Sequence, residues 1–202
     1  MLRRVLAFSL IFILLWTSIG YAEGRSWKLS NEEIQQAIKL GKKAKDNWSL
    51  FNEWLIGYPL NNKGDVDLNK TYFIISTPFG VLAVMTENKW RKYQELTKEE
   101  IEGYLRISEA NLVIGVYFLG DKIDFAKDYH CVIKIGDKII QPTTVENQYV
   151  SDKTDSWPSS PAYEALCSYW FPTDDIPRDA VIQVITIGDK EETFTVDLSK
   201  IR

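Results

Sequence analysis

The tripeptide Gly-Asp-Lys occurs three times in the carboxy-terminal half of the chain, and this repetition constrains the fold more than any other feature. The copies lie at 120–122, 136–138 and 188–190, each after a run rich in β-branched residues and ahead of another. Glycine followed by aspartate gives a tight turn its backbone angles at little cost, so each copy predicts the tip of a β-hairpin. Three hairpins predict an antiparallel β-sandwich over 108–202, for which an immunoglobulin-like form is one candidate.

The amino-terminal half carries helix signals. Ser30 and Thr97 each stand three residues before a glutamate, which is the spacing of a capping box. These boxes predict amphipathic helices over about residues 31–45 and 97–107.

Three further elements complete this half. The sequence predicts a short helix over 48–55, a buried strand over 72–76 and a helix over 78–93, which begins at a Thr-Pro pair. The resulting fold class is α+β, with a mainly helical part (23–107) packed on the sandwich domain (108–202).

The first 22 residues have the order of a secretory signal peptide. Arg3 and Arg4 precede an apolar run over 5–19 and small residues up to Ala22, which predicts cleavage after Ala22. The apolar run is shorter than the roughly 20 residues that span a bilayer as a helix. An uncleaved amino-terminal anchor is the alternative. We therefore expect an exported protein that is periplasmic, at the cell surface or extracellular.

Charge limits the partners of the mature chain. Removing the signal takes away two arginines and no acid, so the formal net charge changes from −4 to −6. An acidic domain without basic clusters is a poor match for nucleic acid or for anionic membrane surfaces. No second long apolar run follows, so we expect no membrane span in the mature form.

Short motifs resemble those of functionally uncharacterised exported bacterial proteins. They are the Leu-Ser-Asn-Glu-Glu-Ile opening at 29–34 and the Ser-Thr-Pro-Phe segment at 76–79 with its helix, together with the β-rich tail. The resemblance implies a setting in the bacterial envelope and supplies no catalytic residues.

The cysteines are predicted to lie in the core. The one histidine, His130, adjoins Cys131, but neighbours on a strand point to opposite faces, so the two side chains do not form a thiolate–imidazole pair. Cys131 and Cys167 each alternate with apolar residues and are expected to face the same core. Two interpretations stay open: two buried thiols, or a disulfide between Cys131 and Cys167. A catalytic cysteine is disfavoured.

Metal binding has one weak candidate. Asp65, Asp67 and Asn69 alternate as in a calcium loop, but Lys70 and Ser76 stand where that pattern needs glycine and glutamate. We expect a solvated polar loop there, with no metal site and no cofactor.

Aromatic residues gather around the proline-rich segment 151–161. Trp157, Tyr163 and Trp170 are the candidate residues for binding a ligand or partner, because exposed rings stack on sugars or anchor proteins. The alternative places Tyr163 and Tyr169 in the core and Trp170 on the other face, which leaves Trp157 exposed.

No motif predicts an enzyme, and a hydrolase would need an acid-lined cleft that the sequence does not specify. The expected function is a protein-binding or envelope-structural module without catalytic activity, whose partner is another envelope protein. The alternative is a carbohydrate-binding module that uses the aromatic cluster near Trp157.

Overall fold

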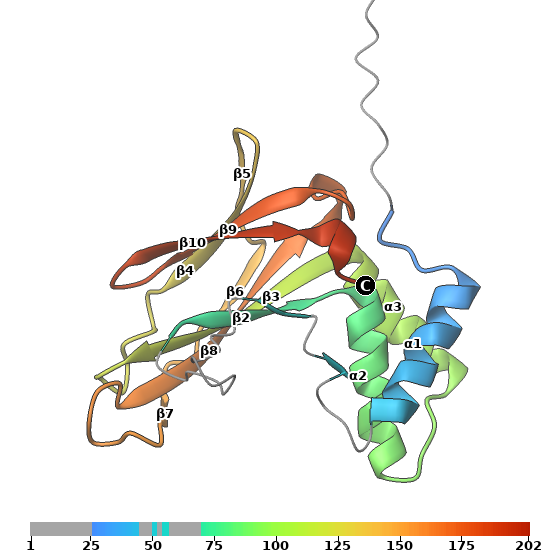
Figure 1. Cartoon of the computed structure of the whole chain (residues 1–202), viewed down its shortest axis with the longest axis horizontal. Coiled ribbons are helices and arrows are strands. Elements are labelled where there is room, and N and C mark those ends of the chain that lie inside the picture. Colours follow the sequence, from blue (N-terminus) through green and yellow to red (C-terminus); the bar gives the residue numbers. More distant parts are fainter. Residues whose placement is uncertain (1–25, 45–49, 52–53, 57–69) are drawn as a thin grey trace, which may run out of the picture.

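The computed structural model describes residues 26–44, 50–51, 54–56 and 70–202. This part of the chain is an α+β protein with three α-helices and two antiparallel sheets, and the helices precede most of the strands (Figure 1). The α+β class expected from the sequence is confirmed. The helices are α1 (Asn31–Ala44), α2 (Pro78–Arg91) and α3 (Lys98–Ala110), with 3-10 turns η2 (Thr173–Asp175) and η3 (Leu198–Lys200).

The strands belong to two sheets. They are β1 (Leu55–Ile56), β2 (Tyr72–Ser76), β3 (Asn111–Gly120), β4 (His130–Ile135), β5 (Lys138–Ile140), β6 (Thr144–Glu146), β7 (Asp152–Lys153), β8 (Tyr163–Pro172), β9 (Val181–Ile187) and β10 (Glu191–Asp197). The larger sheet has the order β1-β2-β3-β8-β6, with β7 also paired to β8, and the smaller has the order β10-β9-β4-β5.

The ladder between β3 and β8 is the longest in the protein's described part. It runs without interruption from Asn111 opposite Pro172 to Gly120 opposite Tyr163. β2 pairs with the other side of β3, so strands from the predicted helical part and the predicted sandwich part share one sheet. The division at residue 107 stays a prediction.

Strict alternation along β3 and β8 turns one face of the larger sheet toward the smaller sheet. The buried residues of this face are Leu112, Ile114, Val116, Phe118, Ala165, Cys167, Tyr169 and Phe171. Phe73 of β2 meets Phe194 of β10 edge-on, with 5.2 Å between ring centroids, so side chains of the two sheets are in contact. One apolar core is shared by both sheets, an arrangement compatible with a β-sandwich. The immunoglobulin-like form stays a prediction.

Two of the three Gly-Asp-Lys copies form hairpins as predicted. Gly136 has a positive φ of 56° in the turn between β4 and β5, and the copy at 188–190 joins β9 to β10. The hairpin predicted at 120–122 is wrong, because β3 has β2 and β8 on its two sides and no free side for β4. The chain instead crosses to the smaller sheet through residues 121–129.

Local capping fixes the helix starts. The Thr97 hydroxyl accepts from the amide of Glu100 while the Glu100 carboxylate accepts from the amide of Thr97, so the predicted capping box is confirmed. Thr77 caps α2 by accepting from the amide of Gly80 at 3.1 Å. The helix predicted over 48–55 is wrong at its end, because Leu55–Ile56 forms β1 opposite β2. Residues 45–49 and 52–53 lie outside the described ranges.

The helices lie together at one end of the sheets (Figure 1). α1 and α2 approach closely at Gly41, where an added Cβ atom would lie 2.3 Å from the Ala83 carbonyl oxygen and 2.6 Å from Thr86 Cβ. This glycine is therefore required by packing between backbones rather than by a turn.

The segment before α1 ties the helices to the loop that follows η2. The Trp27 indole nitrogen donates to the carbonyl of Ile176 at 2.6 Å, and the amide of Leu29 donates to Glu109 Oε1 at 3.0 Å. In the first turn of α1, Glu33 forms an ion pair of 2.9 Å with Arg178, whose side chain is buried.

Two of the helical glycines, Gly41 and Gly103, give opposite predictions. We expect Gly41→Ala to destabilise the protein by about 2 kcal/mol or more, because the methyl group has no space. Gly103→Ala in α3 is the matched control, because nothing lies within 4 Å of its added Cβ. It should stabilise the protein by about 0.5–1 kcal/mol through helix propensity. Urea unfolding measures both, and a neutral Gly41→Ala would contradict the packing.

The Glu33–Arg178 pair predicts a pH dependence. Burial by itself would raise the pKa of Glu33, but hydrogen bonds from Ser30 and the Arg178 guanidinium together hold it below its ordinary value of 4.5. Because the folded pKa is lowered, the stabilisation is present above pH 4.5 and is lost as the pH falls through the folded pKa.

Glu33→Gln is therefore expected to cost about 3 kcal/mol at pH 7, since it leaves the buried guanidinium unpaired. The difference from wild type should shrink as the pH falls below 4.5 and through the lowered pKa of Glu33, where the wild-type carboxylate becomes protonated. Glu32→Gln, an exposed neighbour, is the control and should change the free energy of unfolding by less than about 0.5 kcal/mol. A pH-independent cost for Glu33→Gln would contradict the linkage.

Candidate functional site

The three aromatic candidates lie in different places. Tyr163 begins β8 and Trp170 stands near its other end, seven residues away, which corresponds to about 24 Å along a strand. An odd separation also places the two side chains on opposite faces of the sheet. Trp157 lies outside the strands, in the loop between β7 and β8, and is 46% exposed. The structure therefore does not gather Trp157, Tyr163 and Trp170 into one aromatic platform.

Trp170 is half-buried on the side of β8 that faces away from the smaller sheet. Its backbone carbonyl accepts from both the amide and the hydroxyl of Thr143, at 2.7 Å and 3.1 Å. Its indole nitrogen is buried without a hydrogen-bond partner. Since β8 pairs there with the start of β3, which directly follows α3, Trp170 belongs to the helical end of the sheet.

The segments at the opposite end, where β3 leads into residues 121–129 and β7 leads into β8 (Figure 1), carry several exposed apolar side chains. We define the distal apolar surface as five residues that are between 40% and 71% exposed: Ile123, Tyr149, Val150, Trp157 and Leu166. Hydrogen bonds join the segments that carry them. The amide of Ser151, next to Val150, donates to the carbonyl of Ile123 at 2.8 Å.

Gln148 connects the loop between β6 and β7 to β8. Its side-chain oxygen accepts from the amide of Leu166 at 2.9 Å, and its side-chain nitrogen donates to the carbonyl of Val150 at 3.0 Å. The same nitrogen lies 2.9 Å from the Asp152 carboxylate. Gln148 thus replaces a backbone partner for β8 between the two short strands and fixes the loop that displays Tyr149 and Val150.

Asn147 connects the same loop to the crossing between the sheets. Its side-chain nitrogen donates to the carbonyls of Lys127 and Tyr129 at 3.0 Å and 2.9 Å, and its oxygen accepts from the Tyr169 hydroxyl at 3.2 Å. Sequence reasoning missed Asn147 and Gln148, because their partners are 18 or more residues away in several of these bonds.

Trp157 is held by a cation–π contact. The Lys153 ammonium lies 3.7 Å from the centroid of its ring and covers one of its faces. The loop itself is closed by the amide of Thr154, which donates to the carbonyl of Ala162 at 3.0 Å. Asp121 adds a second tie, since it accepts from the Ser160 hydroxyl at 3.0 Å and from the amide of Ala162 at 3.2 Å.

Cys131 and Cys167 are fully buried free thiols in the shared core, as the strand alternation predicts for their orientation. Burial raises the pKa of the Cys131 thiol. Burial also raises the pKa of Cys167, although hydrogen bonds to the Gln148 backbone and to Tyr169 oppose it. The two sulfur atoms are not bonded to each other in this structure, and the reactivity test below distinguishes buried thiols from a disulfide in the protein.

His130 is occupied by structural contacts. Its Nε2 atom lies 3.0 Å from Gln141 Oε1, and its ring packs edge-on against Tyr169 with 6.0 Å between centroids. The neighbouring thiol of Cys131 is buried in the core, so the arrangement offers no activated nucleophile at this pair.

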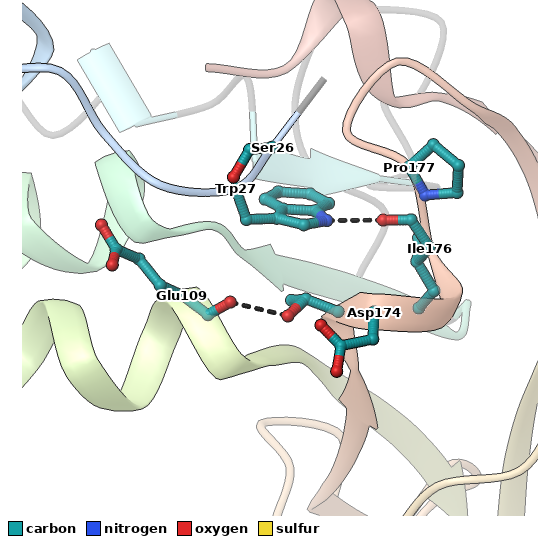
Figure 2. Close-up of a pocket in the computed structure, with 7 residues that line it drawn as sticks. Ser26, Trp27, Glu109, Asp174, Ile176 and Pro177 are labelled. Atoms are coloured by element: carbon teal, nitrogen blue, oxygen red, sulfur yellow. Dashed lines mark hydrogen bonds between the residues drawn. The ribbon is translucent and has the colours of Figure 1, made fainter. Parts of the chain in front are cut away.

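Carboxylates line a small pocket beside the segment that precedes α1, shown in Figure 2. The pocket has a volume of about 240 Å³, and Glu109 and Asp174 are among its lining residues. Glu109 accepts through its side chain from the amide of Leu29 and through its carbonyl from the Thr173 hydroxyl at 2.6 Å. The Trp27 indole closes another side by its bond to Ile176. These contacts join the helices to the sheets, so the residues that line the pocket have structural roles at this junction.

The described ranges contain no group of three or more His, Cys, Asp or Glu residues that could hold a metal ion. The candidate calcium residues Asp65, Asp67 and Asn69 lie outside those ranges, as does the signal segment. None of the helices in the described chain is long and apolar enough to span a bilayer. Comparison with family models, curated proteins and solved structures found no match.

The cysteines give a direct test. Because the thiolate is the reactive form and burial raises both pKa values, neither thiol should react with a disulfide reagent in the folded protein. In denaturant, both thiols should react, and each chain should release two equivalents of the reagent's thiolate. A bridged protein would release none in denaturant until a reductant is added, and its melting midpoint would fall with reductant.

Proposed function

We propose that this chain is an exported protein-binding or envelope-structural module without catalytic activity. The observation that carries the proposal is the distal apolar surface. Apolar residues exposed singly are normal on a protein, but a group of them on adjoining segments is typical of interaction sites. We place the partner, another envelope protein, on this surface.

The loops that display these residues are internally braced, which supports the proposal. Gln148 and Asn147 hydrogen-bond the loop of Tyr149 and Val150 to β8 and to residues 127–129. Binding to a loop that is already ordered costs less conformational entropy than binding to one that must become ordered. Aromatic side chains held in this way, such as that of Tyr149, are typical anchors of protein interfaces.

The carbohydrate-binding alternative receives less support from the geometry. Sugar recognition by stacking needs open ring faces, and Lys153 covers one face of Trp157. Tyr163 and Trp170 lie at opposite ends of β8 and do not extend a platform from Trp157. Titration of tryptophan emission with a panel of glycans tests this alternative.

Export is proposed from the amino-terminal sequence. Intact mass measurement of the protein from the envelope fraction reports whether the chain starts after Ala22 or keeps the segment as an anchor. A protein found only in the cytoplasm would remove the export part of the proposal.

The binding surface is tested in cells with a photo-crosslinking amino acid in place of Tyr149, which is 71% exposed. We expect a reproducible crosslinked envelope protein. Val150→Asp should reduce its yield by about tenfold, since a charge in an apolar contact costs roughly 1–2 kcal/mol or more.

Ile139→Asp is the matched control. Ile139 is exposed to a similar degree, 57% against 67% for Val150, but lies on β5 opposite Lys134, away from the distal surface. This variant should leave the yield unchanged. Equal loss in both variants, or no specific crosslink from position 149, would overturn the proposed surface.

A further inference from the structure

β10 is an edge strand of the smaller sheet. It forms one side of the smaller sheet and pairs only with β9 among the described residues (Figure 1). The pairing runs in continuous register from Glu191 opposite Ile187 to Asp197 opposite Val181, without a bulge. An edge of this length presents a row of unpaired backbone groups unless the protein covers it.

The hydrogen-bond pattern identifies which groups are open. The amide of Leu198 donates to the carbonyl of Ala180 at 2.9 Å, which marks this pair as a hydrogen-bonded one in the ladder. Such pairs alternate in an antiparallel ladder, so Phe194 and Val196 bond to β9. The backbone groups of Thr193 and Thr195 therefore point away from β9, toward the open side.

Proline and lysine, two residues that often block an edge strand, are absent from β10, whose sequence is Glu-Glu-Thr-Phe-Thr-Val-Asp. The charged residues of the strand are all acidic. Phe194 and Val196 point into the core, and Thr193 and Thr195 are exposed on the outer face. The strand is thus free of bulges, β-prone and anchored on its inner side, a form that can accept an additional strand.

Charge distinguishes the possible occupants. β10 carries Glu191, Glu192 and Asp197, and Asp197 is paired with Lys200 at 3.1 Å, so the exposed Glu191 and Glu192 are the acids that would face a basic partner. Full antiparallel overlap of two copies through their open edges would place Glu191 opposite Asp197 twice. Like charges directly opposite one another are destabilising, so a second copy is disfavoured.

We propose that the open edge of β10 binds an extended basic segment of a partner protein, which adds a fifth strand to the smaller sheet. Main-chain hydrogen bonds to Thr193 and Thr195 provide the attachment, and lysine or arginine side chains of the segment meet the acids of β10. This inference rests on the proposed protein-binding function, but it places the segment at a site separate from the distal apolar surface.

The test uses an acetylated heptapeptide of alternating lysine and valine as the probe, with NMR detection of amide exchange in the full chain. In the free protein, the amides of Thr193 and Thr195 should exchange fast, while those of Phe194 and Val196 are protected by β9. Saturating peptide should slow exchange at Thr193 and Thr195 by about tenfold or more. The matching glutamate–valine peptide should have no effect.

A pair of variants at one position separates the backbone from the side chain. Thr195→Pro removes an outward amide that does not bond to β9, so the variant should still fold, because proline is tolerated on the open side of an edge strand. Loss of this amide should abolish peptide binding. Thr195→Ala keeps the amide and should bind within about twofold of wild type. If Thr195→Pro does not fold, the exchange measurement on the wild-type protein still decides the matter.

The inference is overturned if the peptide leaves exchange at Thr193 and Thr195 unchanged, or if both peptides bind equally. Shifts confined to Tyr149 and Val150 would also overturn it, while leaving the proposed function in place. Conversely, Val150→Asp should not alter peptide binding at β10, so the failure of either site can be recognised independently.

Discussion

The continuous ladder between β3 and β8 determines the arrangement of the rest of the described protein. Its register fixes which side chains face the smaller sheet, since a shift by one residue would turn Cys167 and Tyr169 outward. It also occupies both sides of β3, together with β2, and so forces the chain to leave the sheet after Gly120. The distal loops and the helical end are the two ends of this ladder.

The ends differ in their chemistry. At the helical end, polar groups are bonded to one another across the seam between α3 and η2, as in the contacts of Trp27 and Glu109. At the distal end, polar side chains such as Asn147 hold the loops from within while apolar side chains face the solvent. A partner at the distal end would meet a surface whose shape is set before binding.

Sequence patterns predicted what short-range chemistry controls. The capping box at Thr97, the strand over Tyr72–Ser76 and two glycine turns were all predictable, because each depends on neighbours within a few residues. The partner of β3 and the strand at Leu55 were not predictable in this way, since strand pairing is decided by distant segments. The odd spacing of Tyr163 and Trp170 predicted that their side chains lie on opposite faces of the sheet. The role of Asn147 was not predictable, because its hydrogen bonds join three separate parts of the fold.

The contacts of the helical end have a consequence for the order of folding. The Trp27 indole donates to the carbonyl of Ile176, 149 positions later in the chain. The Trp54 indole donates to the carbonyl of Arg202, 148 positions later. The ribosome makes the amino-terminal side first, so α1 and α2 can form early. These two hydrogen bonds to the carboxy-terminal part can form only when nearly all of the described chain has been synthesised. Such long loops slow the closing step. During that interval the apolar sides of the helices stay accessible, and a chaperone that holds nascent chains would find its binding sites there.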